Sequence, residues 1–283
     1  MLRAGPFSDE RVRGLANRRF VTFYFDLSDD GAAGDADARK FVTRIKKELA
    51  RGSVETPNIL IVSAEGALIG ETDNYASSGV VYAAMKKALK DHPEFDGESE
   101  VEKSAKSPLE KARIAFELGK GKTAADLLAK PESEDEWLFL AHVQRWREKW
   151  DDMEAALSHV KREDLLDDAR MERAWRWWRE AKYEALRDAL ADFPVGGDRS
   201  AEAGYFSALA RYHLGEKKEA LKAWKELAKS PEEGPWVYRA DWAYMTVKQE
   251  GKTSFSTGEG SRSPLGRIGY LGRDNPDLKG PGK

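Results

Sequence analysis

Apolar positions near the start of the chain follow two different periods. Residues 21–27 (VTFYFDL) are almost continuously apolar, β-branched and aromatic, which predicts a strand buried on both faces. Residues 38–49 instead show helical spacing, and a second apolar run follows at 59–62. A strand, a helix and a strand in this order predict a βαβ unit with parallel strands. The predicted helix carries its apolar stripe on Phe41, Val42, Ile45 and Leu49.

The next apolar residues predict a hairpin and a helix. A turn at 64–66 leads into a short apolar run at 67–70, which we expect to pair back on the strand at 59–62. Residues 78–90 then predict a helix whose buried side consists of Val81, Met85, Ala88 and Leu89.

Beyond residue 107 the pattern predicts helices with a weak internal repeat. Ala124, Ala155, Ala185 and Ala220 each follow a short polar turn, and they lie 31, 30 and 35 residues apart. That period is typical of helical-hairpin repeats. One hairpin cannot bury its apolar side alone, so stacked neighbours form a continuous core with a concave surface. Residues 236–249 would form the closing helix.

One unit, residues 201–231, resembles the tetratricopeptide (TPR) family. It has a small Ala208 for close helix approach, Gly215 at the turn, and Ala220 and Trp224 in the second helix, with Pro231 after it. The other three units match only at the turn and the alanine. The resemblance implies a groove lined by the first helix of each hairpin, and aromatic and arginine side chains are common anchors of interfaces. By this resemblance, the protein-binding positions are Arg147, Arg170, Trp177, Tyr205 and Tyr212.

Trp177 is the most conspicuous of these residues. Helical spacing in 171–181 groups Met171, Ala174, Trp175 and Trp178 on one side, and Trp177 falls off that side. Two interpretations stay open, an aromatic anchor in the groove or a tryptophan packed at the edge of the core.

The N-terminal segment resembles the C-terminal two thirds of a thioredoxin fold. The segment TPNILIV at 56–62, followed by EGALIG at 65–70, is similar to the place where thioredoxins have a cis-proline before a strand and a hairpin. The resemblance assigns that cis-proline position to Thr56 and Pro57, and a proline that opens a strand breaks no ladder hydrogen bond. An ordinary trans proline in a turn is the alternative.

The chain departs from the thioredoxin pattern before Phe7. The central strand and the Cys-x-x-Cys helix start should precede this residue, and only six residues do. Either the domain has lost its redox segment, or Met1 is an internal methionine of a longer chain.

Composition narrows the classes of function. The chain has 47 basic and 50 acidic residues, a net charge of −3 and a pI near 6.0, so no global field attracts nucleic acid or an anionic membrane. The sequence has no long uncharged apolar run and no secretory signal at its start, which predicts a cytoplasmic protein for the chain as given. A periplasmic or exported location becomes the alternative if the true start lies upstream.

The chain has no cysteine, so it lacks the thiolate that disulfide exchange requires. We therefore expect no disulfide reductase activity. Insulin reduction above the dithiothreitol background would contradict this prediction.

Two segments match parts of known ligand-binding motifs. Residues 26–37 have the acidic spacing of a calcium loop, but a predicted strand precedes them where an EF-hand has a helix, which favours a solvated loop. Residues 119–123 (GKGKT) imitate a phosphate loop, but Phe116 stands where its first glycine is required. The four histidines have no metal-ligand spacing. We expect no cofactor, metal or catalytic site.

We expect an α/β thioredoxin-like domain at 1–97, a linker at 98–106, TPR-like helical repeats at 107–250 and a flexible basic tail at 251–283. Few apolar residues near 93–107 could join the two regions, so we expect them to fold separately.

This order of domains is similar to that of chaperedoxins. It implies a non-catalytic protein-binding adaptor or holdase-type factor, with a protein or peptide partner in the helical groove. The alternative is a thiol-disulfide oxidoreductase whose redox segment is missing from this chain.

Overall fold

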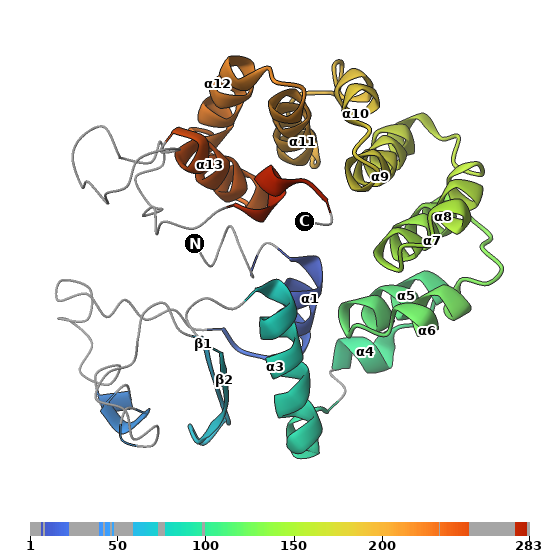
Figure 1. Ribbon diagram of the computed structural model, residues 1–283. Coiled ribbons are helices and arrows are strands. Elements are labelled where there is room, and N and C mark those ends of the chain that lie inside the picture. The colour runs from blue at the N-terminus through green and yellow to red at the C-terminus, as the bar shows by residue number, and fades with distance from the viewer. Residues whose placement is uncertain are drawn as a thin grey trace.

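The computed structural model of the chain describes residues 7, 9–22, 40, 41, 43–45, 47, 59–72, 77–97, 100–231, 233–248 and 275–281. It is mostly helical, with one small antiparallel sheet. The helices after residue 107 form a curved array, and the N-terminal elements lie at one end of that curve (Figure 1). In chain order the elements are α1 (Glu10–Arg19), β1 (Ile59–Val62), β2 (Leu68–Thr72), α3 (Ser78–Asp91), η3 (Pro93–Phe95), α4 (Glu100–Ser104), α5 (Pro108–Glu117), α6 (Gly121–Leu127), α7 (Glu134–Trp146), α8 (Trp150–Leu157), η4 (Glu163–Leu165), α9 (Leu166–Arg179), α10 (Tyr183–Ala189), α11 (Ser200–His213), α12 (Lys217–Ala228), α13 (Pro235–Lys248) and η6 (Pro276–Lys279).

The predicted hairpin and the helix after it are confirmed. Strands β1 and β2 pair antiparallel, with Ile59 opposite Thr72 and Leu60 opposite Glu71. Helix α3 packs on this sheet and α1 packs on α3. The buried side chains of α3 are the four that the helical spacing predicts, and they share one apolar cluster with Val12, Leu15 and Ile61.

Several predictions for the N-terminal segment fall wholly or partly outside the described residues. The residues Thr56 and Pro57, the loop at 26–37 and residues 23–27 of the predicted strand at 21–27 lie outside them. Val21 and Thr22 are described, but they are exposed and lie in no strand, so the prediction of a buried strand is wrong for these two residues. Within the predicted helix at 38–49, the described residues are helical and Ile45 is fully buried. The parallel βαβ unit therefore stays a prediction.

The array consists of consecutive antiparallel helix pairs, α5 with α6, α7 with α8, α9 with α10, and α11 with α12. Helix α13 packs on both helices of the last pair. The first helices also pack against one another in series, from α5 through α7, α9 and α11 to α13. Figure 1 shows these first helices towards the inside of the curve, with α8, α10 and α12 outside.

The turns within the four pairs share one backbone geometry. In each pair the first helix ends at a residue with positive φ: Gly119 (73°), Glu148 (57°), Ala181 (55°) and Gly215 (86°). The next residue then donates its N–H to the carbonyl five positions back, for example Lys182 to Trp177 at 2.8 Å and Glu216 to Arg211 at 2.9 Å. This hydrogen bond is the Schellman pattern of helix ends.

The shared turn corrects the repeat alignment made from the alanines. In the alignment on these alanines, the positions equivalent to Gly119 and Gly215 are Trp150 and Glu180, which lie five residues before Ala155 and Ala185. In the structure the turns lie instead at Glu148 and Ala181. Ala155 and Ala185 are accordingly exposed, and Met153 and Leu186 take the fully buried positions of Ala124 and Ala220. The alanine spacing therefore misplaced the two middle units by one or two residues.

Ala181 and Glu148 adopt a conformation that favours glycine. A side chain in the left-handed region costs about 1 kcal/mol, because its Cβ approaches the following carbonyl oxygen. We expect Ala181→Gly to raise the free energy of unfolding by about 1 kcal/mol, measured by urea denaturation. The matched control is Ala185→Gly inside α10, which should lower it by about 0.5–1 kcal/mol. Destabilisation by both substitutions would contradict the turn assignment.

The predicted linker at 98–106 contains helix α4, and the regions on its two sides are in contact. Arg19 on α1 forms ion pairs with Glu102 at 2.6 Å and Asp96 at 2.7 Å, and Arg18 pairs with Glu117 on α5. Gly14 allows close approach of these helices, since a Cβ there would lie 3.0 Å from the Glu117 Cβ. Leu118 also packs on the apolar cluster of α1, β1 and α3, so the contact includes an apolar side chain as well as charged side chains and a glycine. Separate folding of the two regions stays a prediction.

Among the described residues, no helix combines the length and the apolar character needed to cross a bilayer.

Candidate functional site

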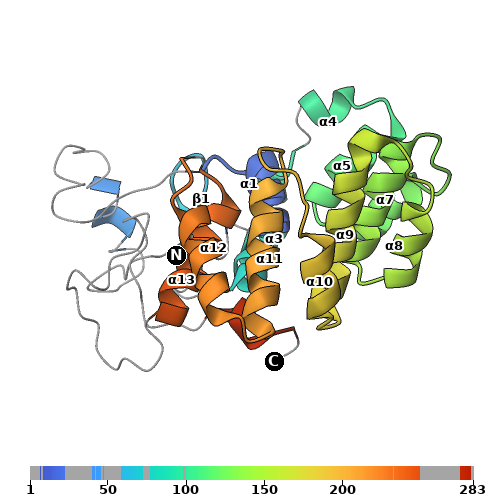
Figure 2. The same cartoon turned by 90° about the horizontal axis from the view of Figure 1, so that it is seen from above.

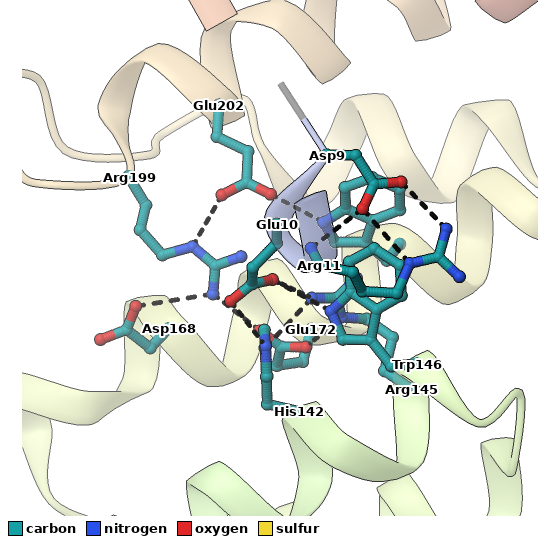
Figure 3. Close-up of polar contacts among 11 residues, drawn as sticks. Asp9, Glu10, Arg11, His142, Arg145, Trp146, Asp168, Glu172, Arg199 and Glu202 are labelled. Carbon is teal, nitrogen blue, oxygen red and sulfur yellow. Dashed lines mark hydrogen bonds and ion pairs between the residues drawn. The ribbon is translucent and has the colours of Figure 1, made fainter. Parts of the chain in front are cut away.

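The inner face of the array, formed by α7, α9, α11 and α13, carries a network of charged side chains, among which Arg145, Glu172 and Glu202 are buried. Figure 3 shows side chains from α1, α7, α9 and α11 converging there. The network alternates in sign along the face, with carboxylates between arginines. Its members are Glu10, His142, Arg145, Asp168, Glu172, Arg199 and Glu202.

Glu172 is the centre of this network. Its side chain is only 2% exposed, and it accepts hydrogen bonds from Arg145 Nε and, at 2.8 Å, from Arg199 Nη1. His142 Nδ1 lies 3.2 Å from its Oε1 atom. Arg199 also donates to Glu202 at 2.8 Å, and Glu202 accepts the indole N–H of Trp175 at 2.7 Å. Glu172 therefore links α7, α9 and the start of α11.

Glu10 connects helix α1 to the same network. Its carboxylate accepts the indole N–H of Trp146 at 3.0 Å, and its other oxygen lies 3.1 Å from His142 Nε2. The guanidinium of Arg11 lies over the Trp146 ring, 4.8 Å from the ring centre. The first turn of α1 is thus attached to α7 by charge and aromatic contacts.

The pKa values of the acidic groups follow from this arrangement. Burial alone would raise the pKa of Glu172, but the charges of Arg145, His142 and Arg199 hold it well below its usual range. Burial also opposes ionisation of Glu10, and His142 and Arg145 lower its pKa to about 2. Both carboxylates are therefore charged at neutral pH.

His142 lies between the two carboxylates. Burial lowers its pKa, but the charges of Glu172 and Glu10 outweigh burial and the repulsion from Arg145, so its pKa is raised above 6.5. When the pKa of a histidine is higher in the folded than in the unfolded state, its protonation stabilises the fold. This contribution is fully present at a pH below the unfolded-state pKa and is lost as the pH rises through the folded-state pKa. We expect the free energy of unfolding to fall as the pH rises above about 6.5, through the range in which His142 loses its proton.

The test compares denaturation curves of wild type, His142→Gln and His92→Gln across this pH range. His92 contacts Glu94 and Phe95 at the surface and lies outside the network, so its substitution is the matched control. His142→Gln should flatten the fall. An equal pH dependence in all three proteins would show that His142 does not gain a proton on folding.

A second part of the inner face holds residues 275–281 of the chain. Helix η6 lies against α11, and both views place it beside the array on the side of α11 and α13 (Figures 1 and 2). Tyr205 donates its hydroxyl to Asp277 Oδ2 at 2.5 Å, and Arg239 Nη1 lies 3.8 Å from the same oxygen. His213 Nε2 lies 3.2 Å from the Asp277 carbonyl oxygen. Burial and the Asp277 charge hold the pKa of Tyr205 well above its usual value, so its hydroxyl remains a donor.

We call the part of the array that contacts residues 275–281 the seat. Several side chains of the docked segment contribute to this contact. Asn275 is 1% exposed, and its Oδ1 accepts the N–H of Asp277 at 3.0 Å. Leu278 packs on the apolar cluster of α9 to α13. Gly280 has a φ of 82°, and a Cβ there would lie 3.2 Å from the Tyr183 hydroxyl. This part of the predicted flexible tail is therefore docked on the array.

The predicted protein-binding residues divide into two groups. Tyr205 lies on the inner face, fully buried beneath residues 275–281, and Tyr212 lies two turns later on the same side of α11. Arg147 donates a hydrogen bond to Gln144, and its Cγ would lie 3.7 Å from a Cβ at Gly121, at the start of α6. Arg170 contacts Asp192 and Phe193 after α10. These two arginines do not join the inner-face network.

Trp177 lies on the same side of α9 as Arg170, because two helical turns separate them. Glu172 and Trp175, the inner-face residues of α9, lie on the other side. Trp177 is half-buried and packs against the apolar cluster of α9 to α13. The structure therefore places Trp177 at the edge of the core.

The shifted repeat alignment explains this division. A shift of one residue rotates a helical position by about 100°. The unit aligned correctly at Gly215 gives Tyr205 and Tyr212 on the inner face. With the turns at Glu148 and Ala181, the residues equivalent to Tyr212 are Arg145 and Trp178.

In comparisons with known proteins, no protein-family model, curated protein or solved structure matches the chain.

Proposed function

We propose that the protein is a non-catalytic protein-binding factor, an adaptor or holdase-type protein, whose partner binds the inner face of the helical array. The seat of residues 275–281 carries the proposal. There the array holds a short 3₁₀-helical turn through a carboxylate, a backbone carbonyl and an apolar side chain. Those are the groups through which grooves recognise peptides.

Two resemblances support the proposal further. Residues 201–231 resemble a TPR unit, and TPR-like hairpins stacked in series present such a concave face. The N-terminal segment resembles part of a thioredoxin fold, but this chain has no cysteine. The absence of a thiolate favours a structural or binding role for this segment over a catalytic role.

The experiment is selection of phage-displayed random peptides on the full-length chain. We expect peptides that bind with micromolar affinity, and Tyr205→Phe should weaken their binding about tenfold, because a hydrogen bond to a carboxylate is lost. The matched control is Tyr244→Phe on α13, which removes a tyrosine hydroxyl that, among the described residues, makes no hydrogen bond to residues 275–281. Failure to select any peptide, or equal binding by the Tyr205→Phe chain, would refute the proposal.

A further inference from the structure

The segment at 275–281 is held by the kind of contacts that define a ligand. Asp277 meets a hydroxyl from α11 and a guanidinium from α13, and the Arg239 guanidinium is itself placed over the Trp236 ring at 4.8 Å. The seat thus offers a positive charge and a donor to one carboxylate. Beside it, the array offers an apolar surface to Leu278.

The seat is built from long-range contacts. Tyr205 and Asp277 are 72 residues apart in the chain, and His213 and Asp277 are 64 apart. The docked part is one short helical turn, Pro276–Lys279, and the described residues form no strand or long helix that would extend the contact. Such a contact persists because a tethered segment meets its site at an effective concentration on the order of millimolar.

A buried donor beside Tyr205 remains unsatisfied while the segment is docked. The indole N–H of Trp224, whose ring lies 6.3 Å from that of Tyr205, has no hydrogen-bond partner among the described residues. A buried donor without a partner is unfavourable.

We infer that residues 275–281 are a built-in ligand that occupies the inner face, and that the partner carries the same chemistry: a turn opened by asparagine, a carboxylate two residues later and then a leucine-like side chain. The partner binds by displacing the built-in ligand. This inference rests on the proposed function for the choice of face, and it adds the class of partner and the way in which access is controlled.

The test measures binding of a fluorescent peptide with the sequence of residues 273–283 to full-length chains by anisotropy. Asp277→Ala/Leu278→Ala removes the carboxylate and the apolar contact of the built-in ligand and leaves the array unchanged. We expect this chain to bind the probe about tenfold more tightly than wild type, because wild type must first release its own segment. A probe with asparagine at the Asp277 position should bind about tenfold more weakly.

Gly280→Ala is the second variant. It keeps every side chain of the array and disfavours only the docked segment, because residue 280 has positive φ and faces Tyr183. It should also strengthen probe binding. Adding Tyr205→Phe to either variant should remove the gain, and Tyr244→Phe should not.

The inference fails if neither variant, folded by circular dichroism, binds the probe better than wild type. It also fails if light scattering shows a concentration-dependent dimer that Tyr205→Phe abolishes, since the occupant would then be a second copy. Peptide selection on the wild-type chain does not use this probe. If the probe measurement fails, the proposed function is not refuted, because the peptide selection tests it separately. If the selection fails, the probe measurement still shows whether residues 275–281 block the inner face.

Discussion

We expect Glu172→Gln to lower the free energy of unfolding by about 3–5 kcal/mol. The substitution keeps the shape of the side chain and removes its charge. Arg145, whose side chain is only 5% exposed, and Arg199, whose side chain is 21% exposed, would then lie beside a neutral amide. Removing one partner of a buried ion pair is costly because the other charge has already lost its hydration.

Asp192→Asn is the matched control for this substitution. Asp192 pairs with Arg170 at 2.9 Å, but its side chain is 84% exposed. Exposed pairs contribute about 0–1 kcal/mol, so the control should change stability by about 0.5 kcal/mol or less. Equal small effects in a denaturant titration would show that water reaches the network and that Glu172 does not hold the inner face together.

The sequence predicts those elements whose signal is apolar spacing. The hairpin of β1 and β2 and the buried side of α3 follow from it, because burial of apolar side chains determines which side of each element faces the core. The helical character of the chain after residue 107 follows in the same way.

The repeat register could be predicted only where glycine marks the turn. Gly119 and Gly215 adopt positive φ at no steric cost, so the sequence shows their turns directly. Glu148 and Ala181 adopt the same conformation without any such signal, since the stacking of the hairpins overrides their local preference. The places of Arg147, Arg170 and Trp177 away from the inner face follow from these two positions. Their part in binding a partner stays a prediction.

The buried charges carry no pattern that sequence spacing could reveal. Glu172 and Arg199 look like ordinary surface residues among many, since 34% of the chain is charged. Their burial depends on α1, α7, α9 and α11 meeting at one place. The same holds for Asp277, whose partners Tyr205 and Arg239 lie far from it in sequence.

We expect Trp178→Ala to lower the free energy of unfolding by about 3–5 kcal/mol, because removal of a buried tryptophan leaves a cavity that its neighbours fill only in part. Trp178 is 6% exposed, and its ring lies 5.4 Å from that of His213 and 6.4 Å from that of Phe206. Thermal or urea unfolding followed by circular dichroism measures the change.

Trp177→Ala is the natural comparison, since it removes the same side chain from the adjacent position of α9. Trp177 is half-buried at the edge of the core, so we expect a loss of about 1–2 kcal/mol. It lies on the side of Arg170, away from Glu172 and Trp175, so binding of the peptide probe to the Gly280→Ala chain should not change. If Trp177→Ala weakens probe binding without lowering stability, Trp177 belongs to the binding groove. A loss as large as that of Trp178→Ala would place both tryptophans in the centre of the core.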